Sequence, residues 1–293
     1  MDLPVTVHDI ERAESFLAAG DIETALPQLE ELTGSVRAWA EEECADTKDR
    51  QWFAFEDAFE RLAYRRVERD PRELVQVDVP LGRLFSALAF AYIRQRDFTA
   101  ARDALMQAVR WNPMNSAYRL DLAEVFRALG DAREWAQLSY SVVERASDGR
   151  SAGLAYANLG QMFLDEGNPM AAAGAGRLAE RLAPAEARVG KLSERLAAEA
   201  ADAVAASDDA VFGELSLQGI PTAPSAEVAI CLLMCASDAA RAGDTAQATD
   251  FTVRARNLVG DAPARALIQL IHESDAELAR EKSSDPGAGS EGE

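Results

Sequence analysis

Residues 82–115 read GRLFSALAFAYIRQRDFTAARDALMQAVRWNPMN, and this stretch decides the fold. Its apolar positions recur at steps of three and four residues, so they share one face of a helix. Small residues stand where a second helix must approach closely, and a proline ends that second helix. The stretch therefore predicts a hairpin of two helices. The residues that set the pattern are Phe85, Leu88, Ala89, Tyr92, Ala101, Leu105, Ala108 and Pro113.

The same pattern recurs 71 residues later, which is two units of 34 residues plus three inserted residues. The counterparts are Tyr156, Leu159, Gly160, Phe163, Ala172, Ala179 and Pro184. Between these two units, Leu122, Ala123 and Phe126 lie 34 residues after Leu88, Ala89 and Tyr92. A single hairpin cannot bury its apolar face alone, so a period of this length predicts a stack of neighbouring hairpins.

These positions resemble the signature of the tetratricopeptide repeat family, closely over Gly82–Pro184 and weakly elsewhere. The resemblance implies an all-α fold: an α-solenoid of tetratricopeptide helix-turn-helix hairpins, with an atypical N-terminal helical hairpin and a C-terminal helical hairpin. It also implies that the first helix of each hairpin lines a groove for a peptide or a partner helix. By alignment to the motif, the groove residues are Arg83, Ser86, Phe90, Ile93, Arg94, Leu120, Glu124, Arg127, Ala157, Gln161 and Leu164. Family members that clamp a chaperone's C-terminal carboxylate carry lysine and asparagine where this chain has Ser86 and Phe90, so that clamp is absent.

Turn signals extend the array towards both ends of the chain. Gly130-Asp131 and Gly167-Asn168 mark turns inside the central array, while Gly20-Asp21 and Gly243-Asp244 indicate hairpins near each end. Terminal repeats drift from the motif because one of their faces meets water. The predicted organisation is an N-terminal helical region with one degenerate repeat and linker (1–81), a core array of three repeats (82–184), a long helix and loop (185–224), a C-terminal hairpin plus helix (225–282) and a disordered acidic tail (283–293).

The segments outside the repeats are less regular. Ser35–Arg69 is interpreted as one or two long helices, and Glu186–Ala206 as one alanine-rich helix. Residues 74–81 alternate apolar and polar like a strand, but Pro80 favours a short extended linker over a sheet. Phe212–Ser225 is interpreted as a loop. An aromatic stripe at helical spacing is typical of a core, and it comprises Trp39, Trp52, Phe53, Phe55, Phe59 and Tyr64.

The net charge of -20 is unevenly distributed. Residues 1–60 carry 16 acids and 4 bases, whereas residues 61–150 carry 12 acids and 15 bases, all of them arginine. Acidic flanks repel polyanions, so nucleic acid is not an expected partner. Arginines suit carboxylate partners, but the favoured interpretation is that Arg61, Arg65, Arg66, Arg69 and Arg72 neutralise the acidic N-terminal helices.

Nothing in the sequence indicates a reaction, a cofactor or a metal. Cys231 and Cys235 share a helix face but lie in an apolar run, which favours buried structural thiols over a metal site. Gly174-Ala175-Gly176 follows no strand, so close helix packing explains it better than a phosphate loop. No segment is apolar for the roughly 18 residues that a membrane span needs. Three cysteines and no signal-peptide pattern lead us to expect a cytoplasmic protein.

Three functions remain open at this point. The favoured hypothesis is a non-catalytic adaptor that binds a protein or peptide, acidic with apolar anchors, in the groove. The alternative is a structural or regulatory subunit of an oligomeric complex that assembles through its ends. An unrecognised hydrolase or nucleotide-binding enzyme is the least favoured.

Overall fold

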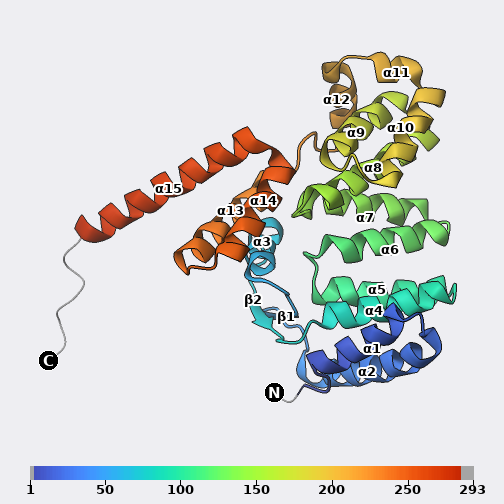
Figure 1. The fold of residues 1–293 in the computed structure, drawn as a ribbon, viewed down its shortest axis with the longest axis vertical. Helices are drawn as coiled ribbons and strands as arrows, with labels where there is room; N and C mark the ends of the chain where they lie inside the picture. Colours follow the sequence, from blue (N-terminus) through green and yellow to red (C-terminus); the bar gives the residue numbers. More distant parts are fainter. Residues whose placement is uncertain (1–2, 285–293) are drawn as a thin grey trace.

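The computed structural model describes residues 3–284, which form fifteen helices and two short strands (Figure 1). The chain is thus mostly helical, as the sequence predicts, although the strands were missed. All but the first two positions of the predicted tail 283–293 lie outside the described residues. In chain order the elements are α1 Val7–Ala18, α2 Ile22–Glu43, β1 Arg50–Phe53, α3 Ala58–Glu68, β2 Glu73–Gln76, α4 Leu81–Arg94, α5 Phe98–Trp111, α6 Ser116–Ala128, α7 Ala132–Arg145, α8 Gly149–Asp165, α9 Pro169–Leu182, α10 Ala187–Glu199, α11 Ala201–Ala205, α12 Asp208–Leu217, α13 Ala226–Arg241, α14 Thr245–Val259 and α15 Asp261–Ser284.

The turns between paired helices follow one design. Gly20, Gly130, Gly167 and Gly243 adopt left-handed φ angles between 79° and 83°, a region that only glycine enters without strain. The Asp or Asn that follows each glycine caps the next helix, because its side chain accepts a hydrogen bond from a backbone N–H three residues on. Arg96 takes the place of glycine in the remaining turn with a φ of 63°. The predicted turns are therefore confirmed.

Helices α4 to α9 form the central stack (Figure 1). Each contacts the next in chain order, and α6 also contacts α8. The positions that set the sequence pattern face inward, because small residues let the backbones approach and large ones fill the space between them. The buried members include Phe85, Leu88, Ala89, Ala101, Leu105, Ala108, Tyr156, Leu159, Ala172 and Ala179.

The N-terminal hairpin packs on this stack through α2, which contacts α4. Helix α2 runs for 22 residues to Glu43, whereas its partner α1 has 12 residues. Its added length brings Trp39 onto Trp111 of α5, with ring centroids 6.4 Å apart. The extra turns of α2 therefore attach the first hairpin to the second helix of the following unit.

The segment after α2 corrects two predictions. Ser35–Arg69 is not one or two long helices, and residues 74–81 are not a simple linker. Strands β1 and β2 pair in parallel, with Arg50 opposite Glu73 and Phe53 opposite Gln76, and α3 connects them. We call residues 50–76 the βαβ insert. The predicted aromatic core is nevertheless confirmed for five of its six members, which are at most 8% exposed, whereas Trp39 is half-buried. Within it Phe53 stacks on Phe55 at 4.8 Å between ring centroids.

Two further predictions fail beyond the stack. The expected single helix Glu186–Ala206 is broken at Ala200, whose φ of -144° and ψ of 41° separate α10 from α11. The first part of the expected loop Phe212–Ser225 is helical, because residues 212–217 belong to α12. The Ser207 hydroxyl caps the start of this helix. Only residues 218–225 form the connection to α13.

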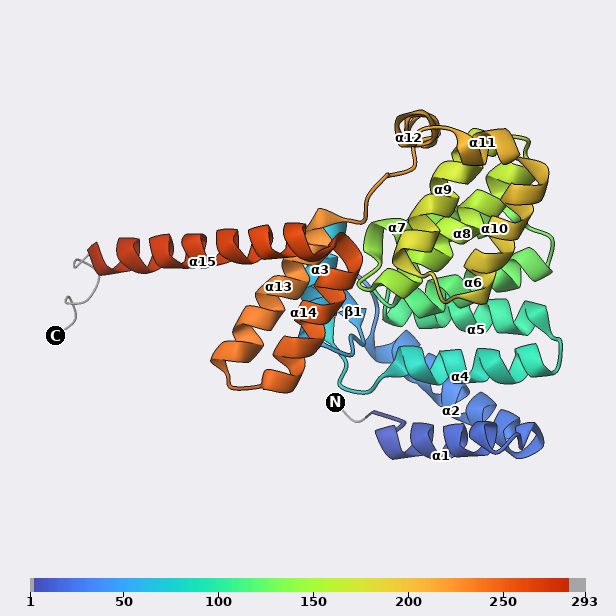
Figure 2. The same cartoon turned by 45° about the horizontal axis from the view of Figure 1, so that its top comes forward.

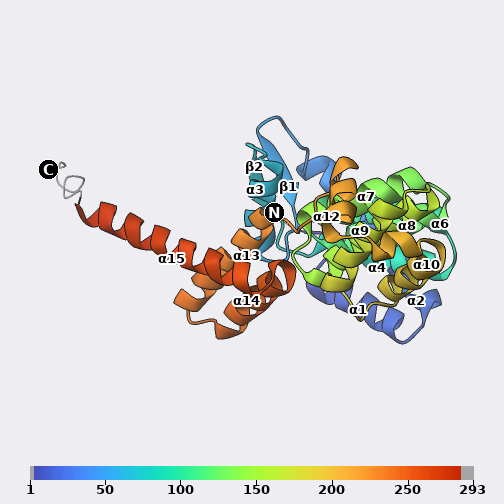
Figure 3. The same cartoon turned by 90° about the horizontal axis from the view of Figure 1, so that it is seen from above.

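The C-terminal hairpin folds back along the molecule (Figures 1 and 2). Helix α13 packs against α3 of the βαβ insert, and α14 contacts α8. Phe251 of α14 lies 6.2 Å from the Phe59 ring, and Arg254 stacks over Phe59 with its guanidinium carbon 5.0 Å from the ring centroid. Helix α15 then projects away from the rest of the chain (Figure 3).

Candidate interaction groove

The predicted groove residues lie on α4, α6 and α8, and their exposure divides them into three groups. Leu120 and Ala157 are only 7% and 1% exposed, so these two predicted contacts are not accessible to a ligand. Burial follows from the packing of α6 against α8 and of α8 against α10. The exposed members are Phe90, Arg94 and Arg127; the half-buried members are Arg83, Ser86, Ile93, Glu124, Gln161 and Leu164.

A cavity of about 330 Å³ lies at the α4 end of this face. Its lining combines α1, α4 and α6, and it brings together three of the predicted residues, Arg83, Ser86 and Phe90. Phe90 is 45% exposed, which is unusual for a large aromatic side chain. We call this cavity the Phe90 pocket. It is an apolar hollow with polar groups at its edge.

Arg83 at the edge of the Phe90 pocket is already paired. Its Nε donates to Glu14 Oε1 at 2.6 Å, and a second guanidinium nitrogen pairs with the other carboxylate oxygen. This hydrogen bonding raises the pKa of Arg83 and joins α4 to α1. Arg83 is therefore held by its own chain rather than offered to a partner.

A polar network crosses the middle of the face, where Arg127 donates to Glu124 Oε2 at 2.7 Å. Arg188 of α10 lies 2.8 Å from Glu124 Oε1 and donates to Asn158 Oδ1 at 2.9 Å. Asn158 in turn donates to Ser139 Oγ. The network joins α6, α7, α8 and α10. Sequence reasoning missed Arg188 and Asn158. The signal available in the sequence was Asn158 itself, a polar residue inside the apolar run of α8.

Arg94 differs from the other groove arginines. It lies one helical turn after Phe90 on α4, where residues four apart share a face. It is exposed, and it forms no ion pair or hydrogen bond with any residue from 3 to 284. Arg96 at the following turn is likewise exposed. Phe90 and Arg94 thus combine an apolar anchor with an unpaired positive charge.

Next to the Phe90 pocket lies a polar cluster that sequence reasoning also missed, and Glu60 and Asn112 are its buried polar members. Tyr118 of α6 lines the pocket and donates its hydroxyl to Glu56 Oε1 at 2.8 Å. Glu60 of α3 accepts from the Glu56 backbone N–H at 2.7 Å and from Asn112 Nδ2 at 2.9 Å. Burial raises the pKa of Glu60 to about 7, and nearby Asp57 adds to the rise. The cluster attaches the βαβ insert to the turn between α5 and α6.

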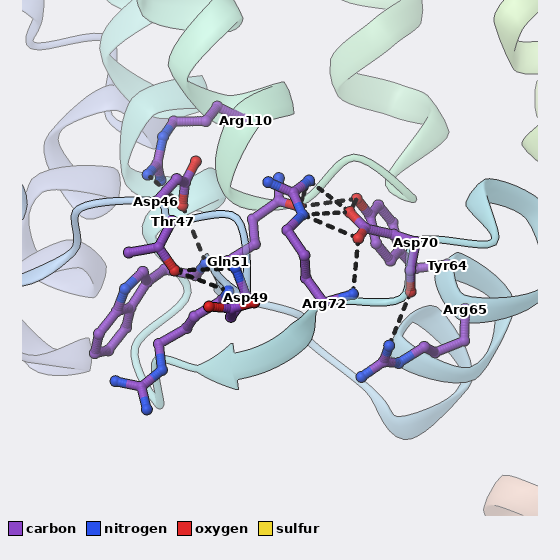
Figure 4. A network of polar contacts seen from close by, with 11 residues as sticks. Asp46, Thr47, Asp49, Gln51, Tyr64, Arg65, Asp70, Arg72 and Arg110 are labelled. Carbon is purple, nitrogen blue, oxygen red and sulfur yellow. Dashed lines mark hydrogen bonds and ion pairs between the residues drawn. The ribbon is translucent and has the colours of Figure 1, made fainter.

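Four of the arginines around the insert contact groups outside the acidic N-terminal helices, so that prediction is wrong for Arg61, Arg65, Arg66 and Arg72. Arg65 donates to the Asp70 carbonyl at 2.9 Å, and Arg72 donates to Asp70 Oδ1 at 2.9 Å (Figure 4). The Arg72 hydrogen bond lowers the pKa of Asp70 to about 2. Arg61 donates to the Leu74 carbonyl, and Arg66 pairs with Glu227 of the C-terminal hairpin at 3.5 Å. Arginine here fixes the βαβ insert and its neighbours, because its donors reach backbone and carboxylate oxygens alike.

Two of the cysteines and the Gly174 segment lie in packed parts of the structure. Cys231 is fully buried and Cys235 half-buried, and burial raises the pKa of each thiol to about 11. In the part of the chain that the structure describes, no cluster of three or more His, Cys, Asp or Glu is arranged to hold a metal ion. Gly174 lies inside α9, where an added Cβ would be 2.7 Å from the Val211 carbonyl oxygen of α12. This agrees with close helix packing.

No protein-family model matches the chain, and no curated sequence is significantly similar to it. Within residues 3–284, none of the helices combines the length and the apolar character that crossing a bilayer requires.

Proposed function

We propose that the chain is a tetratricopeptide-type solenoid that acts as a non-catalytic adaptor and binds a segment of a partner protein at the Phe90 pocket. The observation that carries the proposal is the exposed Phe90, placed at a 330 Å³ cavity and one turn before the unpaired Arg94. The recurring 34-residue pattern and the contacts between consecutive helices support the solenoid.

The chemistry of this surface selects a partner of a particular kind. An aliphatic or aromatic side chain would enter the pocket beside Phe90, and an aspartate or glutamate would pair with Arg94. Arg83 and Arg127 are engaged by Glu14 and Glu124, so the anionic contact centres on Arg94. A chain of net charge -20 repels other acidic segments, which restricts binding to partners that also supply the apolar anchor.

A random peptide library selected on the immobilised protein tests the proposal. We expect enrichment of an acidic residue near an apolar one, with affinity that falls as salt screens the contact. Phe90→Ala and Arg94→Glu should each weaken the selected peptides at least tenfold. Met106→Ala and Arg133→Glu, which change exposed residues on α5 and α7, serve as matched controls. Peptides that bind both groove variants as well as the wild type would contradict the proposal.

A second function, assembly through the C-terminal end, is favoured by one observation. Helix α15 projects from the rest of the chain, and its Leu270 is 59% exposed (Figures 1 and 3). An exposed apolar side chain on a projecting helix is suited to contact with another helix. Light scattering tests this: the full chain should form a dimer that a chain ending at Gly260 does not form, and a full chain that stays monomeric at all concentrations refutes it.

We also propose that the protein is cytoplasmic. Cys44, Cys231 and Cys235 are unpaired, which supports a reducing environment such as the cytoplasm.

A further inference from the structure

A second hollow on the molecule lies away from the Phe90 pocket. It has a volume of about 710 Å³ and lies where the end of the central stack meets the C-terminal hairpin. Its walls come from the end of α9, residues 223–226, the end of α14 and the start of α15. We call it the junction cavity. The volume falls within the range of small-molecule sites, about 300–1,000 Å³.

The lining of the junction cavity is mostly apolar. Side chains from separate elements converge on it, so no single helix forms the site. The apolar members that matter most are Leu182, Pro224, Val259, Pro263 and Leu267. Such a surface favours an aliphatic or aromatic group, because its burial removes apolar area from water.

Backbone contacts hold the walls of the cavity together. Gly149 at the start of α8 lies between α9 and α14: an added Cβ would be 3.0 Å from the Leu182 carbonyl oxygen and 2.9 Å from that of Asn257. Arg254 on α14 donates to Ser147 Oγ at 2.6 Å. The two helix ends that form the walls are therefore attached to the same turn before α8, which preorganises the cavity.

Two arginines give the cavity a positive edge. Arg256 is partly engaged, since its Nε donates to Asp261 Oδ1 at 2.7 Å. Arg181 is exposed and forms no ion pair or hydrogen bond with any described residue. A guanidinium group presents two parallel donors that match a carboxylate. An unpaired arginine at the edge of an apolar cavity is therefore complementary to an apolar molecule with one carboxylate.

We propose that the junction cavity binds a small amphiphilic carboxylate, with its apolar body in the cavity and its carboxylate paired with Arg181. This site is separate from the Phe90 pocket, and the proposal does not depend on the peptide-binding function. Because the occupant contacts both the central stack and the C-terminal hairpin, its binding would also stabilise the docking of that hairpin.

The test uses decanoate as the probe, with decanol and decyltrimethylammonium as matched compounds. The two ionic compounds are used below their micelle concentrations and decanol below its solubility limit. Isothermal titration calorimetry on the full chain should show saturable binding of one decanoate. Decanol should bind about tenfold more weakly, and the cation more weakly still. Arg181→Glu should reduce decanoate affinity at least tenfold while leaving decanol unchanged, and Ala266→Trp should block both by filling the cavity. Arg133→Glu is the matched control for a charge reversal elsewhere.

Three outcomes would overturn the inference: no saturable decanoate binding, equal affinity for decanoate and its cationic counterpart, or binding that Arg181→Glu leaves unchanged. Arg181 is exposed, so its replacement is expected to preserve the fold, and the melting temperature checks this. Peptide binding at the Phe90 pocket, measured on the same variants, should stay at the wild-type level. A failure of one site is thereby distinguishable from a failure of the other.

Discussion

Replacing Glu60 with glutamine should stabilise the protein at alkaline pH and have little effect in mild acid. Glu60 is 8% exposed, and its carboxylate receives two hydrogen bonds, from the Glu56 N–H and from Asn112. Glutamine keeps the acceptor for the Glu56 N–H. Both hydrogen bonds are accepted by Oε2, so a glutamine carbonyl oxygen in that position also accepts from Asn112 Nδ2, with no rotation of the Asn112 amide. Glutamine is therefore well accommodated.

The expected change in the free energy of unfolding follows from the raised pKa of Glu60. Burial first, then the charge of Asp57, raise the pKa of Glu60 from 4.5 to about 7. At about 1.4 kcal/mol per unit, the ionised form is disfavoured in the folded state by roughly 3 kcal/mol. The folded state retains a proton that the unfolded state has lost between pH 4.5 and 7. The stability that the protonated Glu60 carboxyl group contributes is therefore fully present below pH 4.5 and is lost as the pH rises through about 7.

Urea unfolding at pH 5, 6, 7 and 8 measures this effect. We expect Glu60→Gln to exceed the wild type by roughly 1–3 kcal/mol at pH 8 and to approach it at pH 5. Glu23→Gln is the control, because Glu23 is also an acid in a first helical turn but is exposed. A Glu60→Gln difference that does not vary with pH would refute the reasoning, as would destabilisation at pH 8.

Other positions give equally direct tests. Gly174→Ala should lower the free energy of unfolding by about 1–3 kcal/mol, because its Cβ would meet the Val211 carbonyl oxygen, whereas Gly190→Ala, with open space around it, should raise it by roughly 0.5–1 kcal/mol. Equal effects in urea titrations would contradict this. Phe251→Ala should cost about 3 kcal/mol through loss of its contact with α3, measured by the same titrations, and a loss below about 1 kcal/mol would mean that the contact is not a stable one. The thiol of Cys231, with its pKa raised by burial to about 11, should react with a disulfide reagent at pH 8 at least about a hundredfold more slowly in the native than in the unfolded protein; rapid native labelling would be inconsistent with the burial.

The central hairpins were predictable because their information is local. The steps of three and four residues that bury Phe85 and Leu88 lie within one helix, and the glycine and aspartate at each turn act within a few residues. The face of a helix can thus be assigned from sequence. What covers that face cannot, which is why Leu120 and Ala157 were assigned to the groove although other helices pack over them.

The βαβ insert and the position of the C-terminal hairpin were not predictable for a different reason. Two strands of four residues, paired in parallel, give too short an alternation to outweigh the signal of Pro80. The polar cluster around Glu60 depends on Asn112, which is 52 residues away. Ion pairs such as Arg66–Glu227 join residues 161 apart, and no local pattern encodes them.

The folding back of the C-terminal hairpin has a consequence for biosynthesis. Each hairpin of the central stack contacts its neighbour, so it can form soon after it leaves the ribosome. Helix α3 is made early, but part of its surface is covered only when α13 arrives: Arg66 contacts Met234, which is 168 residues later. At typical translation rates that interval is roughly ten to thirty seconds. During it Phe59 lacks its contact with Phe251, so a nascent chain stalled before residue 226 would present this aromatic surface to chaperones and proteases while helices α4 to α9 are already folded.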